Sequence, residues 1–377
     1  MIEPKRQEIS DPQTFLLSDT QTSWSHGLQI NELLKLMVDK GASDLHVTVP
    51  GHPVLRIGGE LVEQEGLPPV TPKDSAAIFE QITNEEQRDV FRKELELDFS
   101  YSVHGLGRFR VNALQQRGSM GLAFRFVPFR VPSIDELGLP QVCKALILKP
   151  KGLILITGQA GNGKSTTLAA MINHLNQTER RNILTIEDPI EFLFSNNKCI
   201  IQQRDLGYDA RSFHTALIHA LRHDLDVIVI SEIRDLPTIS TAITAAETGH
   251  LVIGTMHAID AAQAIDRIID VFPAGQQQQI RLQLAQVLEA VLSQNLLSRI
   301  GGGQVAAFEI LLATSGIRKL VREGKVFEIP ANLEHGASEG KQTMDQALAD
   351  LVKRKIVTRE EAMMKSTNPK KLIELLI

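Results

Sequence analysis

The feature that most constrains the fold of this chain is a glycine-rich loop set between an apolar run and a helix-compatible run. Residues 158–165 read GQAGNGKS and match the pattern G-x-x-x-x-G-K-[ST] at every constrained position. Residues 153–157 favour a buried strand before the loop, and residues 166–175 favour a helix after it. This order predicts a nucleotide-binding domain in which short buried strands alternate with helices around a parallel sheet.

The residue types in this loop suit a nucleoside triphosphate and its magnesium ion. Glycines let backbone N–H groups close around phosphate oxygens, and the start of the following helix adds favourable partial positive charge. Lys164 is predicted to reach the outer phosphates, and Ser165 to bind Mg2+. The residues that we expect to bind ATP are Gly158, Gly161, Asn162, Gly163, Lys164, Ser165 and Thr166.

Hydrolysis also requires a carboxylate that positions or activates the attacking water. Residues 226–231 form a second apolar strand that ends at Glu232. In an open parallel sheet, ligands bind at the edge where the strands end, so we interpret Glu232 as the catalytic carboxylate. A third strand, residues 183–186, leads into an acidic loop that contains Glu187, Asp188 and Glu191. The latter two are equally compatible with helix caps or solvated turns.

Two histidines, His250 and His257, bracket a further apolar strand over residues 251–255. Their spacing fits no zinc pattern and no cysteine lies near them in the sequence. Taken alone, each is more often a hydrogen-bonded structural residue. Beside a strand of the nucleotide domain, His257 is a candidate sensor of the outer phosphate, and His250 a packing or interface residue.

Changes in composition and in hydrophobic periodicity along the chain predict five segments. The first residues are polar without helical or strand periodicity, prolines at 132 and 140 mark a break, and three glycines at 301–303 mark a turn. The expected segments are a flexible arm over 1–28, an N-terminal domain over 29–130, a linker over 131–150, a nucleotide-binding core over 151–300 and a mostly helical region over 301–377. In that last region, Thr358 and Glu361 predict a capping box.

The expected N-terminal domain contains a hairpin formed by residues 107–114 and 120–127. Because side chains alternate across a strand, Arg108 and Arg110 share one face, opposite Phe109. Charged groups on the open face of an antiparallel sheet are ordinary, so the simplest interpretation is that these arginines face water. A functional role requires an anionic partner.

Composition limits the remaining classes of function. No apolar run exceeds five residues, against the roughly 20 needed to span a bilayer, and the first residues lack a secretory pattern, so we expect the chain to stay where it is made. The two cysteines, Cys143 and Cys199, form neither a disulfide framework nor a zinc pattern and are expected to be small buried residues. A net charge of -5 argues against nucleic acid as a partner.

Taken together, the motifs resemble those of the PilT-type retraction ATPases of type IV pili, within the larger group of hexameric secretion ATPases. The resemblance covers about residues 30–350. It rests on four motifs in order: the phosphate loop at 158–165, an aspartate box at 185–192, a Walker B strand at 226–232 and a histidine box at 246–257. Upstream, residues 41–46 and 107–112 resemble the family's N-terminal domain.

The resemblance implies a PAS-like α+β domain followed by a RecA-like P-loop ATPase domain with a helical tail. It also implies that arginines of the first domain reach the nucleotide, so that Arg108, Arg110 and Arg125 become candidate arginine fingers beside Glu232, Glu187 and His257. The implied function is an ATP-hydrolysing homo-hexamer that powers pilus retraction and twitching motility. It would act in the cytoplasm at the face of the inner membrane, on an integral platform protein of the pilus.

Local features bear on which member of the group the chain resembles. Residues 316–323 resemble the alanine-isoleucine-arginine motif of retraction ATPases, with Gly316 in place of alanine, and the four-cysteine module of extension and secretion ATPases is missing. Ser231 replaces the usual glycine before the catalytic glutamate, and Leu225 replaces a usual proline. The alternatives are therefore an accessory nucleotide-binding subunit that joins the ring of a paralogous ATPase, or an ATPase of pilus assembly or secretion.

Overall fold

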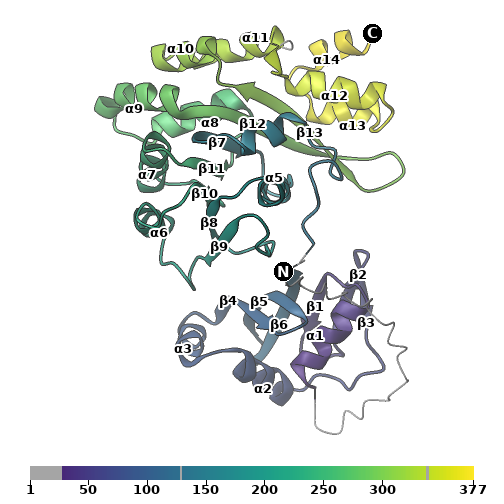
Figure 1. The fold of residues 1–377 in the computed structure, drawn as a ribbon. Helices are drawn as coiled ribbons and strands as arrows, with labels where there is room; N and C mark the ends of the chain where they lie inside the picture. The colour runs from purple at the N-terminus through teal and green to yellow at the C-terminus, as the bar shows by residue number, and fades with distance from the viewer. Residues whose placement is uncertain (1–27, 128–129, 337–338) are drawn as a thin grey trace, which may run out of the picture. The chain divides into compact units, whose positions relative to one another are not determined.

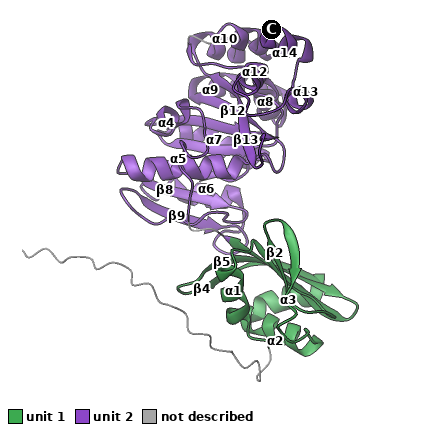
Figure 2. Cartoon of the chain, turned by 90° about the vertical axis from the view of Figure 1, so that its right-hand side faces the viewer, with its two compact units in different colours: residues 1–126 green, residues 127–377 purple. Residues whose placement is uncertain are grey.

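The chain forms two compact units, Met1–Phe126 and Val127–Ile377, each with its own sheet (Figure 2). The computed structural model describes residues 28–127, 130–336 and 339–377. Apart from Leu28, the arm expected over residues 1–28 lies outside the described residues.

Within its described residues, the first unit is built on a six-stranded sheet in the order β3-β2-β1-β6-β5-β4 (Figure 1). The strand pairs β1–β2, β2–β3, β1–β6 and β4–β5 are antiparallel. The glycine pair at 58–59 separates the second and third strands. The strands are β1 (Asp44–Val47), β2 (Val54–Ile57), β3 (Glu60–Glu63), β4 (Glu96–Val103), β5 (Gly107–Gln116) and β6 (Ser119–Val127).

Three helices pack their apolar faces on this sheet: α1 (Ile30–Asp39), α2 (Pro72–Ile82) and α3 (Glu85–Glu94). Phe109 of β5 and Phe124 of β6 are fully buried against Leu33 and Met37 of α1 and Phe79 of α2, in one apolar cluster. Along β5 buried residues alternate with partly exposed ones, which confirms the expected alternation of its arginines with Phe109.

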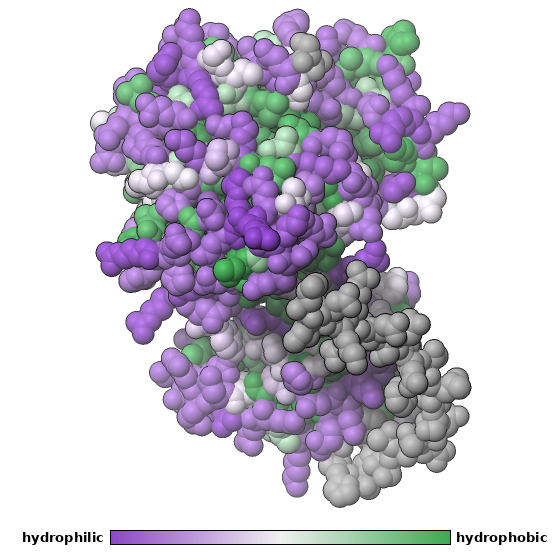
Figure 3. All heavy atoms as spheres, viewed as in Figure 1, coloured by the Kyte–Doolittle hydropathy of each residue, from purple (hydrophilic) through white to green (hydrophobic). Residues whose placement is uncertain are grey.

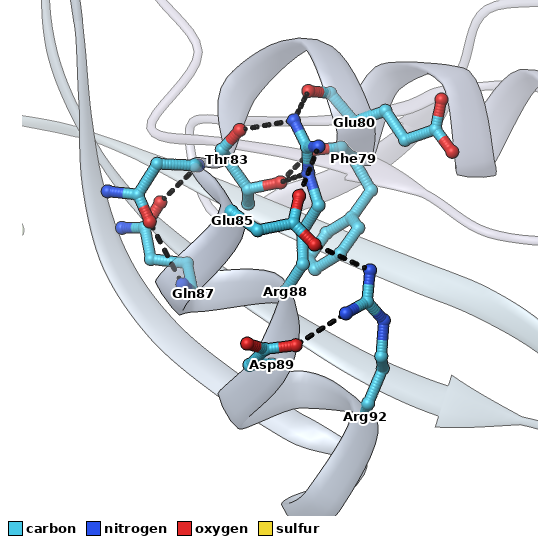
Figure 4. A network of polar contacts seen from close by, with 9 residues as sticks. Phe79, Glu80, Thr83, Glu85, Gln87, Arg88, Asp89 and Arg92 are labelled. Atoms are coloured by element: carbon cyan, nitrogen blue, oxygen red, sulfur yellow. Dashed lines mark hydrogen bonds and ion pairs between the residues drawn. The ribbon is translucent and has the colours of Figure 1, made fainter.

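A polar network holds the corner between α2 and α3 (Figure 4). Asn84 and Gln87 form a reciprocal capping box at the start of α3. Arg88 turns back to the end of α2, where its guanidinium donates to the backbone carbonyls of Glu80 and Thr83, each at 2.7 Å. These bonds satisfy carbonyls that the end of a helix leaves without a helical partner.

In the second unit, the described residues form a seven-stranded sheet in the order β13-β12-β7-β11-β10-β8-β9. Every pair of neighbouring strands from β12 through β7, β11, β10 and β8 to β9 is parallel. The edge strand β13 runs antiparallel to β12. The strands are β7 (Gly152–Thr157), β8 (Asn182–Glu187), β9 (Ile200–Asp205), β10 (Val227–Ile230), β11 (Leu251–Met256), β12 (Leu288–Ser298) and β13 (Gln304–Leu312).

Helices cover both faces of this sheet, which explains why β7, β10 and β11 are apolar at nearly every position. One face packs against α4 (Val142–Ile147) and α5 (Lys164–Thr178). The other packs against α6 (Phe213–Ala220), α7 (Leu236–Glu247), α8 (Ala261–Asp270), α9 (Ala274–Val287) and α10 (Ser315–Glu323) (Figure 1). Cys143 and Cys199 are both buried and free, as expected.

The segment 131–150, for which the sequence predicted a linker, supplies part of this core. Ile134, Leu139, Cys143 and Leu146 are buried on the same sheet face as α5. Proline-rich composition signalled the break in regular structure but not the apolar residues that pack the segment onto the sheet.

After β13 the chain is helical, with α10 followed by the 3-10 helix η1 (Val326–Glu328), α11 (Ile329–Glu334), α12 (Met344–Lys353), α13 (Arg359–Lys365) and α14 (Pro369–Leu376). The expected capping box at the start of α13 is only half formed. Thr358 Oγ1 accepts from the backbone N–H of Glu361, but the Glu361 carboxylate accepts from the backbone N–H of Ser298 in β12 instead. This glutamate therefore joins the tail to the sheet.

None of the helices in the described ranges is both long and apolar enough to cross a membrane. Figure 3 shows hydrophilic residues spread over the viewed face, with apolar residues between them.

We predict that Arg88→Met loosens the α2–α3 corner, because it leaves the carbonyls of Glu80 and Thr83 without their donor. The expected cost is about 1.5 kcal/mol, or roughly tenfold faster amide hydrogen exchange in peptides that cover residues 79–92. Arg92→Met is the matched control, since the Arg92 side chain is 60% exposed and bonds only to exposed carboxylates. Equal exchange in the two variants would contradict the assignment.

Candidate nucleotide-binding site

The glycine-rich loop joins the end of β7 to the start of α5 and depends on glycine for its backbone conformation. Gly161 and Gly163 adopt φ of +78° and +77°, and Gly158 a φ of +148°. A Cβ at Gly158 would also lie 2.5 Å from the backbone oxygen of Gln294. Side chains at these positions are therefore excluded by backbone conformation and by the close approach of β12.

Lys164, the first residue of α5, lies buried beneath this loop. Its Nζ donates to the backbone carbonyls of Gly158 at 2.8 Å and Gln159 at 2.9 Å. Burial lowers the pKa of Lys164, against the opposing charges of Glu232 and Glu191. The ammonium is thus held inside the loop that the sequence motif predicted.

The loop is also bonded to a residue that the motif does not include. Gln294 of β12 donates from Nε2 to the backbone oxygen of Asn162 at 2.7 Å and accepts from Thr167 Oγ1 at 2.8 Å. The Asn162 side chain returns a bond from Nδ2 to the backbone oxygen of Gln294 at 3.0 Å. Sequence reasoning missed Gln294 because it lies 132 positions beyond Asn162 and belongs to no short motif.

Glu232 lies two residues after the end of β10, between two basic side chains. Its Oε1 is 3.2 Å from His257 Nε2, and its Oε2 accepts from Arg234 Nη2 at 2.5 Å. Burial raises the pKa of Glu232, but the hydrogen bond and charge of Arg234, with the charges of His257 and Lys164, hold it below its usual value overall. The carboxylate is therefore ionised at neutral pH.

Glu187 ends β8 and has a different environment. Its Oε1 accepts from Thr185 Oγ1 at 2.6 Å and from Gln203 Nε2 at 3.0 Å. Burial raises the pKa of Glu187, although these bonds and the backbone N–H of Glu191 oppose the rise. This carboxyl group is held in place by neutral donors, whereas Glu232 is held by the guanidinium of Arg234 and lies beside His257.

Ser231, which departs from the family pattern, connects β10 to the acidic loop after β8. Its hydroxyl oxygen accepts from the backbone N–H of Asp188 at 3.1 Å, and Thr255 of β11 donates to its backbone carbonyl. Leu225, the other departure, is buried in the apolar cluster on the α6–α9 face of the sheet.

These groups surround one cavity of about 220 Å³ at the carboxyl edge of the sheet. Lys164, Ser165, Glu187, Glu232 and His257 all line it, so five of the residues singled out from the sequence meet at one place. A lysine ammonium, a hydroxyl and carboxylate oxygens are the donor set that a magnesium nucleotide requires. Phe192, Phe194, Leu168 and Ile172 add an apolar wall.

His250 does not join this group. It precedes β11, at the opposite end of that strand from His257, and its Nδ1 lies 3.0 Å from the backbone oxygen of Ala245 at the end of α7. We therefore interpret His250 as a hydrogen-bonded structural residue and not as part of the nucleotide site.

The three candidate arginine fingers belong to the first unit, on the sheet face opposite Phe109 and Phe124. Arg108 and Arg110 lie on β5 and are partly exposed, and Arg125 lies on β6. Arg125 stands opposite Asp44 across the β1–β6 pair, and its Nε donates to Asp44 Oδ1 at 2.8 Å. The Arg125 side chain remains 66% exposed.

Comparison with known proteins also points to a nucleotide-binding ATPase. Residues 27–304 match the model of the family described as type II/IV secretion system protein. The chain is 46% identical to the type IV pilus retractation ATPase PilT of Pseudomonas aeruginosa, over 91% of this chain and 99% of that protein. It is 39% identical to the type IV pilus ATPase PilU of the same organism, over 89% and 88%.

A crystal structure of the pilus retraction motor PilT with bound ADP superposes with a TM-score of 0.87 at 43% identity, covering 92% of this chain and all of that one. This match confirms the expected fold class, a PAS-like α+β domain followed by a RecA-like P-loop ATPase domain with a helical tail. The chain therefore belongs to the type II/IV secretion system protein family.

Proposed function

We propose that this chain is an ATP-hydrolysing motor subunit that powers type IV pilus retraction and works as a homo-hexamer. The observation that carries the proposal is the position of Glu232, ionised between His257 and Arg234, at the same cavity as Lys164 and Ser165. The PilT relatives supply the cellular role, because their described activity is pilus retraction.

Each group at the cavity has a separate task in the proposed reaction. Lys164 leaves the loop carbonyls to bind the outer phosphates, and Glu232 orients the attacking water and accepts its proton. His257, held against Glu232, reports whether the outer phosphate is present. Ser165 is the residue assigned to Mg2+, which when bound neutralises charge on the phosphate oxygens.

Glu187 is proposed to act with Glu232, with a pKa that burial raises where that of Glu232 is lowered. Its raised pKa and neutral donors suit a carboxyl group that keeps a proton longer than Glu232 does. Arg108, Arg110 and Arg125 are proposed as arginine fingers, a task that needs planar donors with permanent charge. Arg125 donates to Asp44 through Nε, and this bond does not use the two terminal nitrogens of the guanidinium, which we propose meet phosphate.

The segment around Arg318 supports retraction over assembly or secretion. Arg318 donates to the backbone carbonyls of Ala285 and Gln286 at the end of α9 and to Glu289 of β12. The nearest atoms to a Cβ at Gly316 would be 3.9 Å away, so the alanine usual in the retraction motif fits the same backbone. We propose that the hexamer acts on an inner-membrane platform protein from the cytoplasmic face.

We predict that Glu232→Gln abolishes hydrolysis while ATP binding persists. The amide keeps the shape of the side chain but cannot accept the water's proton, so kcat should fall by about 10²–10⁴-fold. Steady-state phosphate release and nucleotide affinity are the measurements. Glu360→Gln is the control, because Glu360 is exposed in α13, outside the four motifs. Unchanged turnover in Glu232→Gln would show that Glu232 is not the catalytic carboxylate.

We predict that Ser231→Ala slows turnover, because it frees the acidic loop from the end of β10. Loss of one hydrogen bond predicts about a 2- to 10-fold lower kcat and faster hydrogen exchange at Asp188. Ser231→Thr retains the hydroxyl and should restore both values. Faster hydrolysis in Ser231→Ala would show instead that the hydroxyl obstructs the attacking water.

The accessory role remains the second candidate, because Ser231 distinguishes this site from the family pattern and a PilU protein is also a relative. We predict that the isolated chain hydrolyses ATP and that its deletion leaves cells with excess surface pili and no twitching. The measurements are phosphate release without a paralogue and counts of pili. Hydrolysis only in the presence of a paralogous ATPase would favour the accessory role, and loss of surface pili would favour assembly.

A further inference from the structure

We propose that Gln294 is a positioning residue that sets the phosphate loop in its nucleotide-receiving conformation before ATP or ADP arrives. The inference rests on the proposed function only in taking the loop as the phosphate site. Its subject is a residue of β12, outside all four motifs that the sequence contains.

The sheet register places Gln294 at the loop. The parallel pairing of β12 with β7 ends with Ser293 opposite Thr157. Beyond this pair β7 turns into the loop at Gly158, while β12 continues in the same direction. Gln294 is therefore the first residue of β12 beyond the pairing with β7, and the loop lies on that side of it, while on the other side it still pairs with Phe308 of β13 (Figure 1 shows β12 beside β7).

Both polar atoms of the Gln294 side-chain amide form hydrogen bonds. Nε2 donates to the backbone oxygen of Asn162 in the loop, and Oε1 accepts from Thr167 in the first turn of α5. The Asn162 side chain closes the ring by donating to the Gln294 backbone oxygen and to Asn295 Oδ1. Gln294 is 2% exposed, so water does not replace these partners.

A neutral amide of this length satisfies both contacts. A carboxylate accepts from Thr167 but cannot donate to Asn162, and an apolar side chain does neither. Gln294 also fixes which residues the loop tolerates, because a Cβ at Gly163 would lie 3.1 Å from its Nε2, and one at Gly158 2.5 Å from its backbone oxygen. The glycine spacing of the loop is thus matched to this strand.

A bond to the Asn162 carbonyl turns that peptide away from the phosphate side. This carbonyl and the N–H of Gly163 belong to one trans peptide group and point in opposite directions, so the bond directs that N–H toward the phosphate side, as an anion-binding nest of N–H groups requires. When this orientation exists before binding, the ligand does not have to order the loop, and affinity rises by the ordering cost that is avoided. The proposed catalytic carboxylate Glu232 follows a different strand, β10, and its own partners are Arg234 and His257.

The test compares Gln294→Met and Gln294→Glu with the control Ser293→Ala in the full-length chain. The control removes a buried hydrogen bond of the same strand, Thr157 Oγ1 to Ser293 Oγ at 2.9 Å, without touching the loop. ADP affinity is measured by calorimetry, and KM and kcat by phosphate release. Thr167→Val removes one of the two contacts of the Gln294 side chain, the one made by α5.

For Gln294→Met we expect ADP affinity about tenfold lower and a raised KM for ATP, with kcat changed by less than about threefold, since two bonds of about 0.7 kcal/mol each are lost. Thr167→Val should lose about half of this in free energy, and Ser293→Ala should bind ADP as the wild type does. Gln294→Glu should bind weakly at high pH and regain affinity relative to wild type as the pH falls, because a protonated carboxyl group again donates to Asn162.

A merely structural role would lower thermal stability in Gln294→Met and Ser293→Ala alike and leave ADP affinity within twofold of wild type in both. That result, or an absence of pH-dependent recovery in Gln294→Glu, overturns the proposal. If Gln294→Met fails to fold, Thr167→Val and Gln294→Glu still decide it. A wild-type chain that binds ADP without hydrolysing ATP would contradict the proposed function alone, and one that binds no ADP would contradict both.

Discussion

The parallel pairing of β7, β11, β10 and β8 is the constraint on which the site depends. Thr157 pairs with Met256, and Ile230 pairs with both Gly254 and Ile186. Because the four strands end nearly level, the residues that follow them must emerge at one edge of the sheet. The phosphate loop, His257, Glu232 and the acidic loop are therefore neighbours, although they come from widely separated parts of the chain.

Much of this site was predictable because short stretches of sequence, read one at a time, indicate where its residues lie. Each of these strands is a short apolar run that ends in a polar residue, so pattern alone placed Glu187, Glu232 and His257 at the sheet edge. The contacts of Gln294 and Arg234 were not predictable in the same way. The partner of the buried Gln294 amide depends on the register between strands that are distant in sequence. The contact of Arg234 with Glu232 depends on the direction in which the arginine side chain turns, which a sequence pattern does not specify.

The fold shows the same division between local and distant information. The hairpin of β5 and β6 and the alternation along β5 follow from turn residues and side-chain period. The packing of Ile134 and Leu139 onto the sheet was hidden by the prolines beside them. Glu361 formed half of its expected cap because the distant N–H of Ser298 competed for its carboxylate. Wherever tertiary partners compete with local ones, the sequence pattern alone cannot choose between them.

The antiparallel pairing of β13 with β12 has a practical consequence for anyone who divides this chain. The glycine turn at 301–303 looks like a boundary between a core and a tail, yet β13 lies beyond it and covers the outer edge of β12. A chain cut at that turn would leave a long row of unpaired backbone groups open to other molecules, a known route to aggregation. The smallest separable ATPase fragment therefore has to extend past Leu312, into the helices that follow it.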